Sequence, residues 1–236
     1  LFAPILRLPG HYCGIATLGL GFVYGPSILN YLIVGLGVGS IYVLGAIGLT
    51  LVYSVRKFAN FAHGDLMTFG AYMVFLVNVM WQLNFLWGVG FAVVTTALVG
   101  IIMELLVFRK LATRGPVQSL VASIGVTLIL QNVIKIWFST EIRSYNTPQP
   151  RDIILFQLGP SQLITIPFFR GAVAIGVSAA LVVFLHLLLK RTTLGKAMRA
   201  TSDNADLARA SGIKTRNVIL WTWVISGAMA AVAGAL

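Results

Sequence analysis

Long apolar runs are the feature that most constrains the fold of this chain of 236 residues. A helix needs about 20 mostly apolar residues to cross the roughly 30 Å hydrocarbon core of a bilayer. Six runs qualify, although the second is short and the sixth reaches the last residue: 29–55, 65–80, 85–108, 117–138, 171–189 and 218–236. The sequence therefore predicts an all-α, polytopic transmembrane helical bundle with five full spans and a truncated sixth.

The first residues do not follow this pattern. Three prolines and an arginine interrupt residues 1–26, and no basic segment precedes a clean apolar core, as it would in a signal peptide. We predict an irregular N-terminal segment over 1–26 and a transmembrane domain over 27–236. Because the chain starts without Met and ends inside an apolar run, we expect a fragment of a longer protein.

The charge is strongly unbalanced, with 17 Lys and Arg against 6 Asp and Glu, a net charge of +11. In a soluble domain this balance suggests nucleic-acid binding. Here 12 of the 17 basic residues fall in three alternate loops, 56–63, 109–116 and 190–217. The positive-inside rule makes these loops cytoplasmic, so we expect the lipid bilayer and no nucleic acid as surroundings. The proline-containing loop 139–170 is then external, with short strands near 152–158 and 162–166.

A polar cluster separates the first two apolar runs. Its members surround a glycine before the second run: Asn60, Phe61, His63, Gly64 and Asp65. Polar backbone at membrane depth is tolerated only where protein buries it or a cavity is present, so this segment is a candidate re-entrant turn or part of a translocation path. The alternative is an ordinary cytoplasmic turn, with Asp65 favouring the start of the next helix. One His and one Asp do not form a metal site, and we predict none.

Loop 190–217 is the most polar stretch of the chain. Ser202 or Asp203 can cap a short helix over 204–210, and Gly212 can end it. Three alanines give this helix a small-residue face that another protein can grip: Ala205, Ala208 and Ala210. The alternative is a solvated loop whose basic residues only fix the topology.

Among the other polar residues within the spans, three are candidates for a role inside the membrane. Glu104 is near the inner end of the third run, where a side chain can extend to the interface. Gln131 and Asn132 lie near the outer end of the fourth run, and we expect them to make hydrogen bonds between helices.

Three stretches make the chain resemble a known family: 36–71, which contains Asn-Phe-Ala-His-Gly, 120–132, and 191–236, which contains Arg-Ala-Thr. In this order they resemble the H-type permease subunit of ABC importers for branched-chain amino acids, over roughly residues 28–236. Residues 5–22 are more similar to the partner, M-type permease.

The resemblance implies that a cytoplasmic helix couples the permease to an ATPase. By this resemblance the coupling helix lies near the end of loop 190–217 and includes six residues: Asp203, Asn204, Ala205, Ala208, Arg209 and Gly212. The implied partners are two cytoplasmic ATPase subunits, a second permease (M-type or identical) and a periplasmic binding protein, in a bacterial inner membrane. The chain has no Walker A pattern, so ATP and Mg would be bound by the ATPase subunits, with no cofactor here.

The expected activity is translocation of branched-chain or other hydrophobic amino acids. A urea or amide importer is the nearest alternative, because those permeases are closely similar. An ion-coupled transporter would need carboxylates near the membrane midplane. A passive channel would need a selectivity filter, and no segment has that character. A membrane enzyme is not expected either, because no HExxH, GxSxG or paired carboxylates occur.

Overall fold

The computed structural model describes residues 10–139, 144–146, 153–157, 163–166 and 168–236, and side chains within 31–139, 144–146 and 171–236. Contacts divide the chain into two units, which are described separately. Unit 1 comprises residues 1–39 and 149–176, and unit 2 comprises 40–148 and 177–236. Helix α1, Gly10–Arg56, contributes residues to both units.

Five helical segments of the described residues are long and apolar enough to cross a membrane. They are Tyr31–Arg56 within α1, Phe85–Leu111, Pro116–Phe138, which is α5, Gly171–Arg191, and Thr215–Ala235, which is α9. The segment Phe85–Leu111 consists of α3 (Phe85–Met103), the π-helical turn η3 (Glu104–Phe108) and α4 (Arg109–Leu111). The segment Gly171–Arg191 ends with α6 (Ala174–Arg191). The second predicted span is a shorter helix, α2 (His63–Phe75), followed by the π-helical turn η2 (Leu76–Met80). The predicted transmembrane bundle is confirmed.

The N-terminal prediction needs correction. Residues 10–26 belong to α1, whereas we predicted an irregular segment, and residues 1–9 lie outside the described residues. Pro26, the proline of this segment that lies among the described residues, falls inside the helix, and prolines are tolerated in membrane helices when neighbouring groups satisfy the freed backbone.

Unit 1 also contains a β-hairpin. Strands β1 (Ile153–Gln157) and β2 (Leu163–Ile166) pair antiparallel, from Ile153 opposite Ile166 to Gln157 opposite Leu163, with an irregularity between Ile154 and Phe156. The two predicted strands are therefore present. The π-helical turn η4 (Phe168–Val173) follows them and leads into α6.

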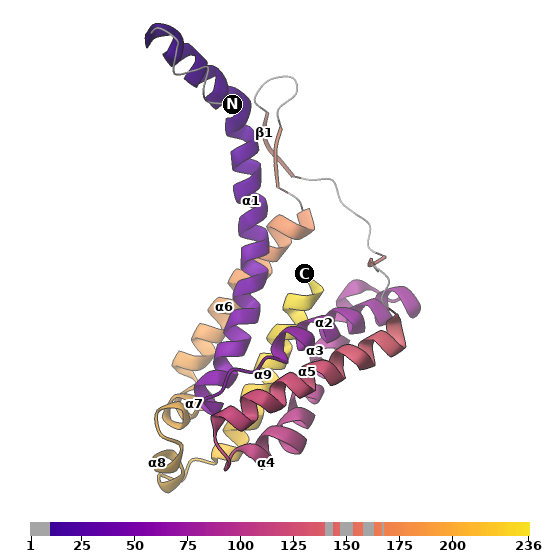
Figure 1. Ribbon diagram of the computed structural model, residues 1–236, viewed down its shortest axis with the longest axis vertical. Coiled ribbons are helices and arrows are strands. Elements are labelled where there is room, and N and C mark those ends of the chain that lie inside the picture. The colour runs from indigo at the N-terminus through magenta and orange to yellow at the C-terminus, as the bar shows by residue number, and fades with distance from the viewer. Residues whose placement is uncertain (1–9, 140–143, 147–152, 158–162, 167) are drawn as a thin grey trace. The chain divides into compact units, whose positions relative to one another are not determined.

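Unit 2 is organised around α9, which packs closely against α2 and α3 (Figure 1). Glycines permit this: a Cβ on Gly227 would meet Ala97 Cα at 3.0 Å, and one on Gly70 would meet Ala231 Cα at 2.6 Å. In lipid, helix association depends on such close approach, because apolar burial offers little gain there. Trp223 of α9 is fully buried and stacks on Phe108, with ring centroids 5.3 Å apart.

Loop 190–217 is mostly helical. Helix α7 (Thr193–Asp203) follows α6, and α8 (Ala205–Ala210) precedes α9. We predicted only the second of these helices. Residues Gly195, Met198 and Thr201 are buried at a spacing of three, which attaches α7 to the bundle through one face.

Candidate functional site

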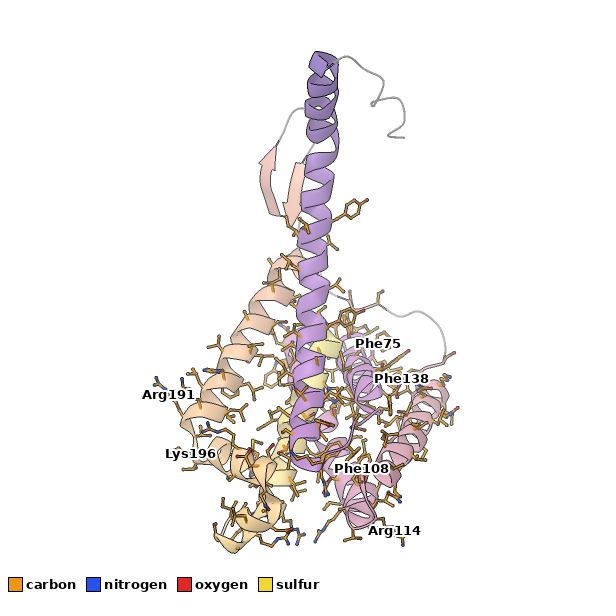
Figure 2. All side chains as sticks on the ribbon, turned by 60° about the vertical axis from the view of Figure 1, so that its left-hand side comes forward. Phe75, Phe108, Arg114, Phe138, Arg191 and Lys196 are labelled. Carbon is orange, nitrogen blue, oxygen red and sulfur yellow. The ribbon has the colours of Figure 1, made fainter. Side chains whose placement is uncertain are left out.

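The three basic loops meet at one end of unit 2. A cavity of about 350 Å³ has lining residues from each of them: Lys57, Ala112 and Thr201. Lys196, Phe108 and Arg114 lie toward this end in Figure 2, whereas Phe75 and Phe138 lie farther from it. Loops on the same side of a membrane lie at the same end of a helical bundle. The position of these three loops therefore agrees with the topology expected from their basic residues.

Helix α8 is stabilised at its first turn by Asn204. The Asn204 Oδ1 atom accepts hydrogen bonds from the backbone N–H groups of Asp206 and Leu207, each at 3.0 Å. We predicted Ser202 or Asp203 as the cap, and this is wrong because both residues are still helical within α7. Ser202 Oγ instead donates to the Ser54 carbonyl at 3.0 Å, which attaches α7 to the end of α1.

Gly212 ends α8, as expected. Its φ of 86° lies in the left-handed region, where a side chain is strained. The Ile213 N–H donates to the Ala208 carbonyl and the Gly212 N–H to the Arg209 carbonyl, both at 3.0 Å. This pattern satisfies carbonyls that a helix end otherwise leaves unpaired.

The two faces of α8 differ from our expectation. Ala208 is 4% exposed and Ala205 is half-buried, so the small-residue face is largely turned inward, although Ala210 is exposed. The outward side instead presents Leu207, which is 65% exposed, and Arg209. A short helix that exposes a leucine and an arginine offers a surface that a partner protein can bind.

The turn before α2 folds into the bundle. Asn60 is 2% exposed, and its Oδ1 accepts from the Ala62 N–H at 3.2 Å. The Phe61 N–H donates to Ser123 Oγ of α5 at 3.2 Å, while the Phe61 side chain is 57% exposed. The polar backbone is thus buried in protein, as its depth requires.

His63 lies at the crossing of three helices. The side chain is 4% exposed, and neither ring nitrogen has a hydrogen-bond partner of normal geometry among the described residues. A Cβ on Gly48 of α1 would meet His63 Cε1 at 2.8 Å. Ser226 Oγ of α9 donates to the Gly48 carbonyl at 2.8 Å. Gly48 thus provides the space that the imidazole occupies, whereas Gly64 is exposed with no atom near its added Cβ.

Asp65 joins α2 to α5. Gln131 Nε2 donates to Asp65 Oδ1 at 3.1 Å, which is the interhelical hydrogen bond that we expected of Gln131. Asn132 differs, because its Nδ2 donates to the Leu128 carbonyl of its own helix at 2.7 Å. Helix α2 begins at His63, and the residue before it, Ala62, makes no capping hydrogen bond with its side chain. Asp65 therefore stabilises the first turn of α2 through its negative charge and not as the cap.

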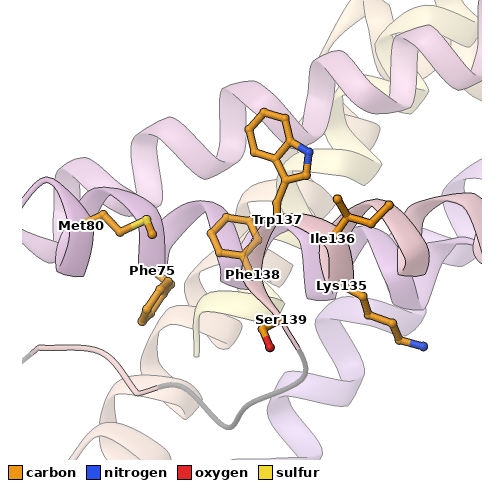
Figure 3. A pocket seen from close by; sticks show the side chains of 7 residues that line it. All are labelled: Phe75, Met80, Lys135, Ile136, Trp137, Phe138 and Ser139. Atoms are coloured by element: carbon orange, nitrogen blue, oxygen red, sulfur yellow. The ribbon is translucent and has the colours of Figure 1, made fainter.

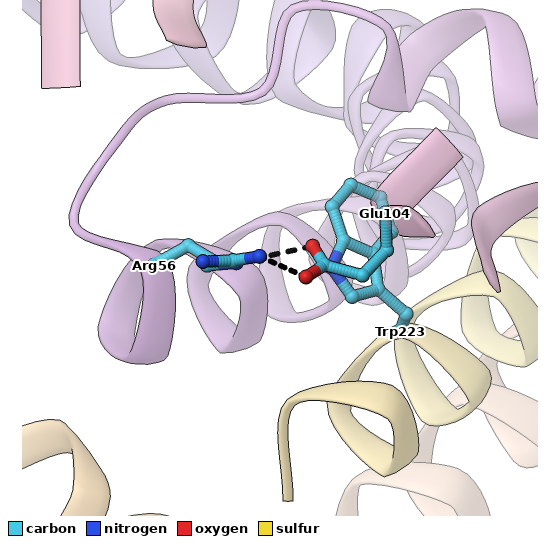
Figure 4. Close-up of polar contacts among 3 residues, drawn as sticks. All are labelled: Arg56, Glu104 and Trp223. Carbon is cyan, nitrogen blue, oxygen red and sulfur yellow. Dashed lines mark hydrogen bonds and ion pairs between the residues drawn. The ribbon is translucent and has the colours of Figure 1, made fainter. Parts of the chain in front are cut away.

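Glu104 does not extend to the interface, and that prediction is wrong. It is 2% exposed and forms an ion pair with Arg56, whose Nε donates to Glu104 Oε2 at 3.0 Å. The indole Nε1–H of Trp223 donates to the same oxygen at 2.8 Å. Figure 4 shows the three side chains and the contacts between Arg56 and Glu104. A buried carboxylate is tolerated when charge and hydrogen bonds both compensate it, and here α1 and α9 supply them.

Sequence reasoning missed Arg56 and Trp223 as partners of Glu104. Glu104 starts the π-helical turn η3, a feature frequent at functional sites. A usable signal existed, because a carboxylate in an apolar span needs a cation, and Arg56 ends the first span at the same membrane edge.

At the other end of unit 2, α5 and η2 border a cavity of about 380 Å³ (Figure 3). Of the residues that line this cavity, Phe75 and Phe138 are buried in the protein, while Trp137 and Lys135 are exposed. Nearby, Tyr145 Oη donates to the Ala71 carbonyl at 3.2 Å, and burial raises the pKa of Tyr145 to about 12. Exposed Trp and Lys at a helix end are typical of the membrane interface, so this cavity carries no functional assignment.

Comparisons with known proteins agree with the geometry. The family described as branched-chain amino acid transport system, permease component, matches residues 31–236. The chain is 31% identical over 223 residues to the high-affinity branched-chain amino acid transport system permease protein BraD of Pseudomonas aeruginosa, which covers 89% of this chain and 72% of that protein. It is also 31% identical over 219 residues to the permease protein LivH of Escherichia coli K12, covering 86% and 68%.

A shorter similarity concerns a permease with a different named cargo. The autoinducer 2 import system permease protein LsrC of Escherichia coli is 36% identical over 78 residues, which is 32% of this chain and 23% of that protein. No solved structure matches the chain.

Proposed function

Because the chain belongs to the branched-chain amino acid transport system permease family, we propose that it forms half of the membrane pathway of an ATP-driven importer. It is a multi-pass membrane protein of a family of transport subunits. The proposed cargo is branched-chain or other hydrophobic amino acids, carried across the bacterial inner membrane. Loops 56–63, 109–116 and 190–217 face the cytoplasm in this proposal.

The proposed assembly has four kinds of component. A second permease, M-type or a further copy, completes the pathway, and a periplasmic binding protein delivers the cargo. Two cytoplasmic ATPase subunits bind ATP and Mg, because this chain has no phosphate-binding loop of the Walker A type. The chain therefore acts as a transport subunit whose reaction energy comes from its partners.

The observation that carries the proposal is the outward side of α8. This helix has a capped start and a glycine-ended finish, and it exposes Leu207 and Arg209 where three basic loops meet. Its inner face contacts the bundle through Ala208, and Ser202 of the adjacent α7 is bonded to α1. A movement imposed on α8 by an ATPase can thus reach α1 and α9, whose packing then switches between two arrangements.

Reversing one charge on α8 tests this role. We expect Arg209→Glu to reduce amino-acid uptake and cargo-stimulated ATP hydrolysis at least about tenfold, a loss of roughly 1.4 kcal/mol of coupling. Arg199→Glu on α7 is the matched control, because it reverses the charge of an exposed arginine outside α8. Gly212→Trp should have the same effect as Arg209→Glu by straining the end of α8.

Both variants should insert in the membrane at the level of the unaltered protein, since α8 lies outside the five spans. Unchanged uptake and unchanged ATP hydrolysis in Arg209→Glu and Gly212→Trp would refute the coupling role. Uptake that persists after ATP depletion, while ion gradients are kept, would instead favour an ion-coupled transporter. Among the described residues, the two carboxylates of the bundle that such a mechanism needs are engaged, Glu104 by Arg56 and Asp65 by Gln131.

The cargo is tested separately. Competition of labelled leucine uptake by unlabelled valine, isoleucine or urea distinguishes amino-acid import from urea or amide import. We expect displacement by the apolar amino acids and none by urea, in line with the names of the two relatives that span most of the chain.

A further inference from the structure

A second cavity, of about 220 Å³, lies beside the buried ion pair at the end of unit 2 where the basic loops meet. Four arginines line it, each from a different helix: Arg56 of α1, Arg109 of α4, Arg209 of α8 and Arg216 of α9. Helix α8, which the proposed function couples to an ATPase, thus shares this cavity with the ends of three bundle helices.

The lining has an excess of positive charge. Glu104 is its one carboxylate, and Arg56 already neutralises it. Arg209 has an exposed ion pair within α8, whereas Arg109 and Arg216 are exposed and have no ion pair among the described residues. A recess with this imbalance concentrates anions. Guanidinium groups bind phosphate with two parallel hydrogen bonds, which makes a phosphate the best-matched anion.

The remaining wall is apolar. Leu105 of η3, Ile219 and Leu220 of α9 are half-buried and belong to membrane-spanning segments. A ligand with a phosphate next to a hydrocarbon chain therefore fits both parts of the lining. Basic pockets between transmembrane helices, near their cytoplasmic ends, are the geometry that binds anionic lipid headgroups.

We infer that this cavity binds the phosphate of an anionic phospholipid, such as phosphatidylglycerol, and thereby joins α8 to the ends of α1, α4 and α9. The site does not depend on which solute crosses the membrane, so it can fail without affecting the proposed transport function. Free inorganic phosphate offers the same chemistry without the chain, and the experiment separates the two.

The permease, purified with its partner subunits in phosphatidylcholine nanodiscs that contain a minor share of phosphatidylglycerol, is analysed by native mass spectrometry for retained phosphatidylglycerol. We expect Arg109→Gln with Arg216→Gln to weaken retention about fivefold per arginine. Lys110→Gln with Arg114→Gln is the matched control, because it removes the same charge from residues that do not line the cavity. Arg109→Lys with Arg216→Lys, which keeps the charge and loses the planar fork, should weaken retention less.

A second arm uses nanodiscs of phosphatidylcholine alone with inorganic phosphate, followed by phosphorus NMR line broadening. Broadening that the arginine variant abolishes, without lipid retention, supports the anion site and assigns it to free phosphate. Equal loss of lipid in both glutamine pairs overturns the site, because bulk charge then explains it. Unchanged lipid retention also overturns it, and accompanying loss of the ATPase subunits would place the two arginines at a protein interface instead.

Discussion

Loops 56–63 and 190–217 are both rich in basic residues, but their ion-paired arginines differ in how far they are exposed. The Arg56 side chain is 11% exposed, and it is paired with the Glu104 side chain, which is 3% exposed. Arg209 is 67% exposed, and its partner Asp206 is 90% exposed. Both arginines contribute to the basic signal, but Arg56 is part of the bundle whereas Arg209 lies on its outer surface.

The two regions differ in how their residues contribute to the fold. Residues of the turn 56–65 make hydrogen bonds to α5, lie against Gly48 of α1 and share a buried cluster with Trp223 of α9, so their replacement disturbs the packing of several helices. Residues of α8 rely on local caps, so their replacement should leave the bundle folded. Three predictions separate these two behaviours.

The largest expected effect comes from Arg56→Ala. It leaves Glu104 buried with the Trp223 indole as its one remaining partner among the described residues, and removing one member of a buried pair costs about 3–5 kcal/mol. Thermal unfolding of the detergent-solubilised protein measures the loss. The matched change Arg199→Ala, in the exposed part of α7, should alter stability by less than about 0.5 kcal/mol.

A double variant sharpens this comparison. Arg56→Met with Glu104→Leu removes both charges and keeps apolar volume, so it should recover most of the lost stability. Equal melting temperatures for Arg56→Ala and Arg199→Ala would show that the pair contributes nothing, and that the two loops do not differ as described.

A smaller effect is expected from Gly48→Ala. The new Cβ would stand 2.8 Å from His63 Cε1 and 3.3 Å from the Ser226 carbonyl oxygen, and overpacking of this kind costs about 1–3 kcal/mol. Gly64→Ala is the control, because no atom lies within 4 Å of its added Cβ. Chemical denaturation compares the two variants.

The clash has a specific partner, which a double-mutant cycle can identify. His63→Ala in the Gly48→Ala background should remove the steric conflict, so the combined cost should fall below the sum of the single costs. Additive costs would mean that His63 does not occupy the space beside Gly48.

Much of the fold follows from local pattern in the sequence. Apolar runs predict the five spanning helices found among the described residues to within a few residues, and the two short strands expected in loop 139–170 match β1 and β2. Helix α7 was missed because its segment is polar overall, although Gly195, Met198 and Thr201 do recur at helical spacing. The pattern does not predict the extent of α1 before residue 27, because the prolines and the arginine of that segment are typical of an interrupted helix.

The sequence predicts those features of the candidate site that depend on neighbouring residues, and not those that depend on contacts between distant helices. The end of α8 at Gly212 follows from one residue type in one conformation. Ser202, Asp203 and Asn204 are all good caps, and the length of α7 decides among them by leaving only Asn204 extended, with φ −153° and ψ 106°. The Arg56–Glu104 pair joins residues 48 positions apart, so it depends on how the end of α1 lies against η3, which no short pattern encodes.

The smallest expected effect on stability comes from Asn204→Ala. Losing the bonds to the Asp206 and Leu207 N–H groups costs about 1 kcal/mol, and only within α8. Hydrogen exchange at these two amides should accelerate about fivefold while global unfolding stays unchanged, because α8 opens by itself.

Asn204→Asp, which keeps an accepting oxygen, should behave like the unaltered protein. Ser202→Ala should leave these amides protected, since Ser202 bonds to Ser54 and not to α8. A global loss of stability in Asn204→Ala would mean that α8 folds as part of the bundle, which would remove the contrast with the turn 56–65.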